Sequence, residues 1–448
     1  MLFMPEIPER KGAVRSDSPK LEPRTLDSWW PKVLRVLSKL GPGIVTGAAD
    51  DDPSGIATYS QAGAQFGYTM LWTLLFSFPL MAGIQEISAW IGRVTGIGIA
   101  GNIRRHYSVW VLYPVVALLL AANVINLGAD IGAMGGALKL LVGGPALLYS
   151  VGFGIVSAII AVLVPYRQYA QILKWSALVL LVYVATAFVA HVHWPSALTA
   201  TFIPSISLST GYLSALMAVF GTTISPYLFF WQASQEVEEQ RADASEKPLK
   251  QAPGQASAQL QAMRTGTYLG MGFSNFIAFF IMLDAAAVLH AHGQIDIQTS
   301  TQAASALRPL AGEAAFLLFS IGIIGTGLLA IPALAGSAAY TLAETFKWPI
   351  GLQRKLDKAW AFYATLCVAT SLGVALDFTS INPIKALFWS AVINGVAAVP
   401  IMFVMMLMTA NPKLTGTLRL PMPQRIVGWA ATAVMFAVAA GMIATWGN

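Results

Sequence analysis

The chain has 448 residues, of which 56% are hydrophobic and only 11% are charged, and its formal net charge is +6. This charged fraction lies far below the roughly 25% of soluble proteins and, with a mean hydropathy of +0.64, predicts a polytopic helical membrane protein. The single cysteine, Cys367, excludes an intramolecular disulfide and a cysteine-based metal site.

The start of the chain is polar and dotted with proline, so we expect residues 1–34 to form a disordered cytoplasmic tail, with no cleavable signal peptide. Residues 35–446 form the predicted transmembrane domain. Its apolar runs predict about 11 membrane-spanning helices, at 38–64, 69–92, 109–138, 145–164, 170–190, 211–235, 266–290, 313–345, 359–376, 384–408 and 425–446.

The basic residues test this topology. With a cytoplasmic N-terminus, the cytoplasmic segments hold 24 of the 27 Lys and Arg residues, and only Lys139, Arg308 and Lys385 lie outside. The positive-inside rule produces this asymmetry, so the positive charge indicates orientation and not nucleic-acid binding. We expect a multi-pass, monomeric protein of the cell (inner) membrane, with the lipid bilayer as its surroundings.

The first span is interrupted by GAADDDPSG, residues 47–55. Pro53 removes a backbone donor, and the following Ser-Gly pair lowers helix propensity. Because lipid cannot satisfy the carbonyls that a broken helix frees, such backbone must line a cavity.

Three aspartates precede this break, and acidic side chains inside a membrane are normally functional. Successive residues lie about 100° apart on a helix, so the three carboxylates cannot all face one ligand. We predict that Asp52, next to the break, is a cation ligand. Asp51 is predicted to gather cations in a vestibule, and Asp50 to make a structural hydrogen bond or salt bridge.

The sixth span is interrupted in the same way by FGTTISPYLFF, residues 220–230. Breaks in the first and sixth spans predict an inverted 5+5 repeat of the LeuT-like type, with a substrate site between the two breaks at mid-membrane. The connection that follows, residues 236–264, is mixed in charge and rich in Ala, Gln and Pro, so we expect a flexible cytoplasmic loop.

Residues 41–72, GPGIVTGAADDDPSGIATYSQAGAQFGYTMLW, resemble the first span of the Nramp divalent-metal transporters. The family's Asp-Pro-Gly-Asn break is matched by Asp52 to Gly55, so serine replaces the glycine and Gly55 replaces a metal-binding asparagine. The family's sixth-span motif, Ala-Thr-Val-Met-Pro-His, corresponds to Thr222 through Tyr227. Ser225 thus stands where the family has a methionine ligand, and Tyr227 and Gln232 stand where many members have histidines.

These departures replace a soft thioether with oxygen donors and enlarge the site, which suits a partly hydrated Mg²⁺. The pattern resembles the Nramp-related magnesium transporters, and Mn²⁺ is expected to share the site. No cofactor is expected besides the transported ion. The predicted metal-site residues are Asp52, Gly55, Thr222 and Ser225, with Asp51 and Asn394.

The family's third span carries an acid pair that forms part of a proton route, and here its positions hold Asn126 and Ala129, with Asp130 one residue off register. We therefore predict weak or absent proton coupling. Asp284, in the seventh span, is either a proton carrier or a buried structural acid. His290 and His292 are expected at the membrane interface.

Two other transporter functions remain open: a proton-coupled Mn²⁺/Fe²⁺ transporter of the same family, and an organic-solute transporter of the same architecture. A membrane-embedded enzyme is not expected, because no span carries a nucleophile–base pair or a His/Glu metal triad.

Overall fold

The computed structural model describes residues 42–164, 176–379 and 381–446, and all regular structure in these ranges is helical. The predicted tail and the start of the predicted fifth span lie outside them. The longer helices are α2 (Pro42–Asp50), α3 (Pro53–Phe66), α4 (Trp72–Thr95), α5 (Ile99–His106), α6 (Val109–Val142), α7 (Ala146–Leu163), α9 (Leu181–Val189), α10 (Trp194–Phe202), α11 (Thr210–Thr223), α12 (Pro226–Ala242), α13 (Ala256–Asp284), α16 (Ala315–Phe346), α17 (Trp360–Leu376), α18 (Pro383–Thr409) and α20 (Met422–Thr445).

Both predicted helix breaks are present. The first span divides into α2 and α3, and the sixth divides into α11 and α12. In each case a proline occupies the first turn of the second half-helix, where its missing N–H costs nothing. Asp52 caps α3, because its side chain accepts a hydrogen bond from the Gly55 N–H.

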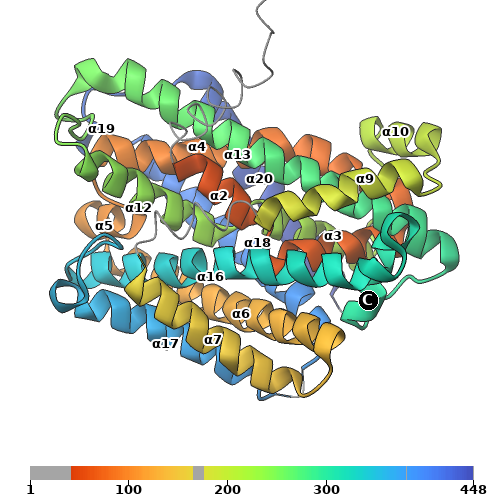
Figure 1. Ribbon diagram of the computed structural model, residues 1–448. Helices are drawn as coiled ribbons and strands as arrows, with labels where there is room; N and C mark the ends of the chain where they lie inside the picture. Colours follow the sequence, from red (N-terminus) through yellow and green to blue (C-terminus); the bar gives the residue numbers. More distant parts are fainter. Residues whose placement is uncertain (1–41, 165–175, 380, 447–448) are drawn as a thin grey trace, which may run out of the picture. The chain divides into compact units, whose positions relative to one another are not determined.

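Eight helical stretches in the described chain are long and apolar enough to cross a bilayer: 72–95, 109–142, 146–163, 210–242, 253–292, 300–346, 383–409 and 422–445. The other three predicted spans correspond to the pair α2 and α3, to the short apolar helix at 178–189 and to α17. Helices α6, α7, α16 and α17 pack side by side, as Figure 1 shows.

The half-helices are held by very close backbone contacts. A Cβ on Gly47 would lie 2.2 Å from the Gly270 backbone carbon, so α2 and α13 touch through small residues. A Cβ on Gly221 would lie 2.0 Å from the Ala391 carbonyl oxygen, and α11 is held against α18 in the same way. These contacts place the two breaks within the helix bundle.

Gly221→Val is expected to lower the melting temperature sharply, because the added side chain forces α11 away from α18. Gly152→Val is the matched control, since a Cβ at Gly152 in α7 meets no atom within 4 Å. The measurement is thermal unfolding of the detergent-solubilised protein, followed by size-exclusion chromatography. Equal melting temperatures for the two variants would contradict the packing described here.

The connection after the sixth span differs from the prediction in its extent. Helix α12 continues to Ala242 and α13 begins at Ala256, so residues 243–255 alone lie between these two helices. Leu249 within them is buried, and its N–H donates to the carbonyl oxygen of Arg93. The Arg93 guanidinium in turn binds three carboxylates, those of Glu236, Glu239 and Glu246. This charged contact explains why a segment poor in large apolar residues still packs against α4.

Candidate metal site

Asp52 lies at the break between α2 and α3 and is only 1% exposed. Its Oδ1 atom accepts hydrogen bonds from the Ser54 hydroxyl at 2.6 Å and the Gly55 N–H at 2.8 Å. Its Oδ2 atom lies 3.1 Å from the amide nitrogen of Asn126 and 3.3 Å from the phenol oxygen of Tyr227. Asp52 thus joins α3, α6 and α12, and one of its oxygens faces the middle of the bundle.

A row of polar side chains continues from Asp52 across α6 to α18. The Asn126 amide nitrogen donates to Asp52 and also to Asp130 Oδ2, at 2.9 Å. The Asn126 oxygen accepts from the Asn394 amide at 2.8 Å. The Oδ1 atom of Asp130 and the single side-chain oxygen of Asn394 are buried and have no hydrogen-bond partner in the part of the chain that the structure describes. Asn394, one of the predicted site residues, is thus linked to Asp52 through Asn126.

Asp130 is the residue that the sequence analysis missed. It was set aside because it stands one position from the family's acid, yet it lies four residues after Asn126 and thus on the same helix face. Its carboxylate and that of Asp52 both accept from the same amide nitrogen. The carboxylates of Asp52 and Asp130 therefore lie side by side at this amide.

Gly55 and Thr222 meet across the gap between the half-helices. A Cβ on Gly55 would lie 3.2 Å from the Thr222 hydroxyl and 3.4 Å from the Asp50 carbonyl oxygen. The Ser225 hydroxyl lies 2.9 Å from the Gly221 carbonyl oxygen and 2.8 Å from that of Thr222, which closes the end of α11. This bonding directs the hydroxyl hydrogen away from the site, so the Ser225 oxygen keeps lone-pair capacity.

Asp51 does not join Asp52. Its Oδ1 atom lies 2.9 Å from the Ser274 hydroxyl of α13, which is also 2.5 Å from Asp50 Oδ2. The predicted hydrogen bond of Asp50 is thus present, and it is made to the same serine that contacts Asp51. The structure separates the three consecutive aspartates into a single residue and a pair.

Polar side chains that are uncharged at neutral pH stand at the two positions where many family members have histidines. Tyr227 donates to the Ala49 carbonyl at 3.0 Å and faces Asp52. Gln232 accepts from Gln85 at 2.7 Å and donates to Thr267 at 2.7 Å. Asp284 is fully buried at the end of α13, before a π-helical turn at Ala285–Leu289, and neither of its oxygens has a partner among the described residues.

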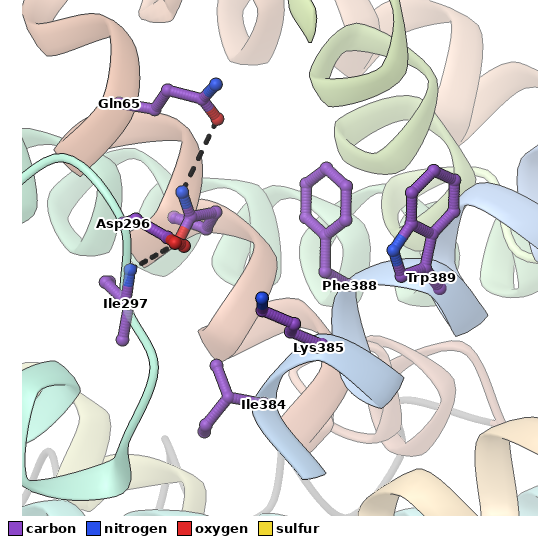
Figure 2. Close-up of a pocket in the computed structure, with 8 residues that line it drawn as sticks. Gln65, Asp296, Ile297, Ile384, Lys385, Phe388 and Trp389 are labelled. Atoms are coloured by element: carbon purple, nitrogen blue, oxygen red, sulfur yellow. Dashed lines mark hydrogen bonds between the residues drawn. The ribbon is translucent and has the colours of Figure 1, made fainter. Parts of the chain in front are cut away.

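A polar cavity of about 210 Å³ lies at the far end of α3 from Asp52. Gln61 holds the segment opposite, since its side-chain oxygen accepts from the Ile297 N–H at 2.9 Å. Asp296 and Lys385 line the same cavity, with Gln65, Ile384, Phe388 and Trp389 (Figure 2). This end of the bundle is the one that the distribution of Lys and Arg residues predicts to face outward.

The donor atoms around Asp52 are carboxylate, amide and hydroxyl groups, which suit hard cations such as Mg²⁺, Ca²⁺ and Mn²⁺. No group of three or more His, Cys, Asp or Glu residues able to hold a metal occurs among the described residues. A cation at Asp52 would therefore rely on two carboxylates, neutral oxygens and retained water. This arrangement can bind a hydrated divalent ion reversibly, which transport requires.

The chain is similar to known proteins along most of its length. The family model described as natural resistance-associated macrophage protein-like (Nramp) matches residues 43–445. The divalent metal cation transporter MntH of Klebsiella pneumoniae is 28% identical over 408 residues, which cover 89% of this chain and 92% of that protein. MntH of Aeromonas hydrophila is 28% identical over 340 residues, or 73% of this chain and 78% of that one.

Solved structures show the same fold. A manganese transporter of Eremococcus coleocola, in complex with an aromatic bis-isothiourea substituted compound, superposes with a TM-score of 0.71 at 16% identity, covering 94% of this chain and 90% of the other. MhsT in complex with L-phenylalanine gives a TM-score of 0.60 at 12% identity, with 90% and 97% covered. The predicted all-α LeuT-like fold with broken first and sixth spans is thereby confirmed.

Proposed function

Because this chain belongs to the Nramp family of membrane divalent-metal transporters, and not to a family of enzymes, we propose that it imports Mg²⁺, and also Mn²⁺, through the site around Asp52. We further propose that this import is weakly coupled or uncoupled to protons. The orientation that agrees with the distribution of Lys and Arg residues has the N-terminus in the cytoplasm, with the protein in the cell (inner) membrane.

One observation supports the cation site most directly. Two buried carboxylates, Asp52 and Asp130, approach each other so closely that one amide group, the NH₂ of Asn126, bonds to both. The amide hydrogens supply only partial positive charge, and a buried carboxylate pair is stable only with fuller compensation. A divalent cation that takes the place of this NH₂ group matches the charge of the pair. Rotation of the Asn126 amide would then offer its oxygen as a further ligand.

The preference for Mg²⁺ over softer ions rests on the residues that replace the family's ligands. Gly55 and Ser225 leave a larger site without the asparagine and the thioether, and Mg²⁺ usually keeps several of its waters when a protein binds it. Mn²⁺ accepts the same oxygen donors. Uptake by proteoliposomes tests the proposal, with Mg²⁺, Mn²⁺ and Cd²⁺ offered separately and in competition. Uptake of Cd²⁺ in strong preference to Mg²⁺ would contradict it.

Proton coupling is expected to be weak because Tyr227, Gln232 and Asn126 replace the titratable groups of the family's relay. The membrane potential alone supplies the driving force. Each elementary charge gains about 2.3 kcal/mol across 100 mV, so a divalent ion gains about 4.6 kcal/mol, enough for more than a thousandfold accumulation.

Mg²⁺ added outside liposomes that hold a clamped negative potential and a pH dye is therefore expected to enter without internal acidification. Two carboxyl groups offer alternative proton routes, Asp130 beside the site and Asp284 in α13. Acidification that tracks Mg²⁺ uptake would reverse the prediction, and its loss in Asp130→Asn or Asp284→Asn with Mg²⁺ uptake retained would identify the carrier.

A further inference from the structure

The carboxyl groups of Asp50 and Asp51 both contact the Ser274 hydroxyl, which supplies one hydrogen for two oxygen atoms. The Ser274 oxygen lies 2.5 Å from Asp50 Oδ2 and 2.9 Å from Asp51 Oδ1. A serine hydroxyl has one hydrogen and can donate to one of these oxygens only. The other contact brings two sets of lone pairs together unless a proton on one of the carboxyl groups or a bound cation lies between the atoms.

The other carboxyl oxygen of each aspartate also lacks a hydrogen-bond donor among the described residues. Asp50 Oδ1 and Asp51 Oδ2 are buried and have no hydrogen-bond partner among the described residues, and the two side chains are 1% and 0% exposed. An unpaired carboxylate in such a place costs several kcal/mol. Two adjacent ones, each with an unused oxygen, need a compensating group.

Among the described residues, no basic side chain is placed to compensate them. Helix α2, which carries Asp50 at its end, packs against α12, α13 and α16. Helices α2, α3 and α16 contain no Lys, Arg or His. Arg264 of α13 lies ten residues from Ser274 and pairs with Glu86 at 2.8 Å, and Arg241 lies at the far end of α12. The C-terminus of α2 adds the negative end of its helix dipole to the same region.

A neutral oxygen donor lies near the pair as well. Tyr59 of α3 is fully buried, and its phenol interacts electrostatically with all three aspartates. The Thr222 hydroxyl lies nearby, but the buried Tyr59 oxygen has no hydrogen-bond partner among the described residues. Asp52, in contrast, has donors at both of its oxygens: the Ser54 hydroxyl and the Gly55 N–H at Oδ1, and the Asn126 amide at Oδ2. The pair and Asp52 therefore form two separate sets of ligands on one broken helix.

We propose that Asp50, Asp51 and Ser274 form a second cation site, which binds a divalent ion of the kind that binds at Asp52. Two carboxylates match the charge of a divalent ion, and an all-oxygen set selects a hard one. The identity of the ion rests on the proposed function, but the existence of the site does not. The protein then binds two ions at adjacent positions, one on each side of the break between α2 and α3.

The number of Mn²⁺ ions bound per chain tests this inference, measured by equilibrium dialysis on the full-length protein in detergent. The wild type is expected to bind two ions. Asp51→Asn is expected to bind one, and Ser274→Ala to weaken one of the two sites by about tenfold or more. Asp52→Asn is expected to bind one ion, at the pair. Ser320→Ala is the matched control, since this buried hydroxyl bonds to the Ala137 carbonyl and meets no carboxylate in the hydrogen-bond network.

Two results would overturn the second site. One is a wild-type stoichiometry of one ion that is lost only in Asp52→Asn, which would mean that protons compensate the pair. The other is a stoichiometry of two that persists in Asp51→Asn and in Ser274→Ala. Melting temperatures of all variants separate lost binding from lost folding. The proposed function fails by a different result, namely the absence of divalent uptake by proteoliposomes, so the two failures are distinguishable.

Discussion

Asp52→Ala and Asp52→Asn are both expected to reduce divalent-metal uptake by proteoliposomes by more than about 100-fold, since loss of even an outer-shell partner of a metal ligand costs 10–100-fold. Asp52 is the residue at which the two broken helices and α6 converge, with contacts from Gly55, Asn126 and Tyr227. Removing its charge leaves Asp130 as the only carboxylate bonded to Asn126, which is too little to dehydrate a divalent ion even in part.

The asparagine variant separates charge from structure. Its side-chain oxygen can still accept from the Gly55 N–H and keep the cap of α3, so we expect its melting temperature to stay close to that of the wild type. Asp357→Asn is the matched control, because Asp357 is exposed and lies outside the site. Uptake at the wild-type rate in either Asp52 variant would refute the assignment.

The double change Gly55→Asn with Ser225→Met is expected to shift preference from Mg²⁺ toward Mn²⁺ and Cd²⁺. The asparagine fills the gap in front of Thr222, and the methionine supplies a thioether that softer ions prefer. A change of at least about tenfold in the Cd²⁺ to Mg²⁺ uptake ratio is expected, which corresponds to about 1.4 kcal/mol. Competition uptake in proteoliposomes measures it.

Whether the double variant can fold depends on the room for a side chain at position 55. A Cβ at position 55 would lie 3.2 Å from the Thr222 hydroxyl and 3.4 Å from the Tyr59 ring, so these neighbours must move by a few tenths of an ångström. The single variants serve as controls, because Gly55→Asn alone reduces the volume and Ser225→Met alone changes the softness. An unchanged ion ranking in a stable double variant would show that these two positions do not set selectivity.

Local chemistry explains why the helix breaks were predictable. Pro53 and Pro226 cannot continue a helix from the preceding turn, and both stand at the first turn of a new one. Asp52 was assigned for the same reason, since it is the residue next to the freed backbone. Asn394 was recognised as a polar residue in an otherwise apolar span, and it bonds to Asn126.

The remaining features depend on contacts between distant helices. Asp51 turns to Ser274, which lies 223 residues away, and no pattern around Asp51 predicts that partner. Asp130 was not predicted as a site residue, because it stands one position away from the acid of the family pattern. Its spacing of four from Asn126, which places the two side chains on one helix face, was nevertheless visible in the sequence. The extent of the loop before α13 was missed because the contacts of Arg93 with three glutamates stabilise it, and these contacts form only once the helices pack.

The most direct test of the cation site at Asp52 is a crystal structure of the protein soaked in Mn²⁺, with an anomalous difference map. We expect an anomalous peak between Asp52 Oδ2 and the Asp130 carboxylate, in contact with Asp52. The Asn126 amide is expected to rotate so that its oxygen faces the ion. Loss of this peak in Asp52→Asn crystals is expected as well. A map with Mn²⁺ bound elsewhere in the protein and none at Asp52 would contradict the proposal that Asp52 binds the transported ion.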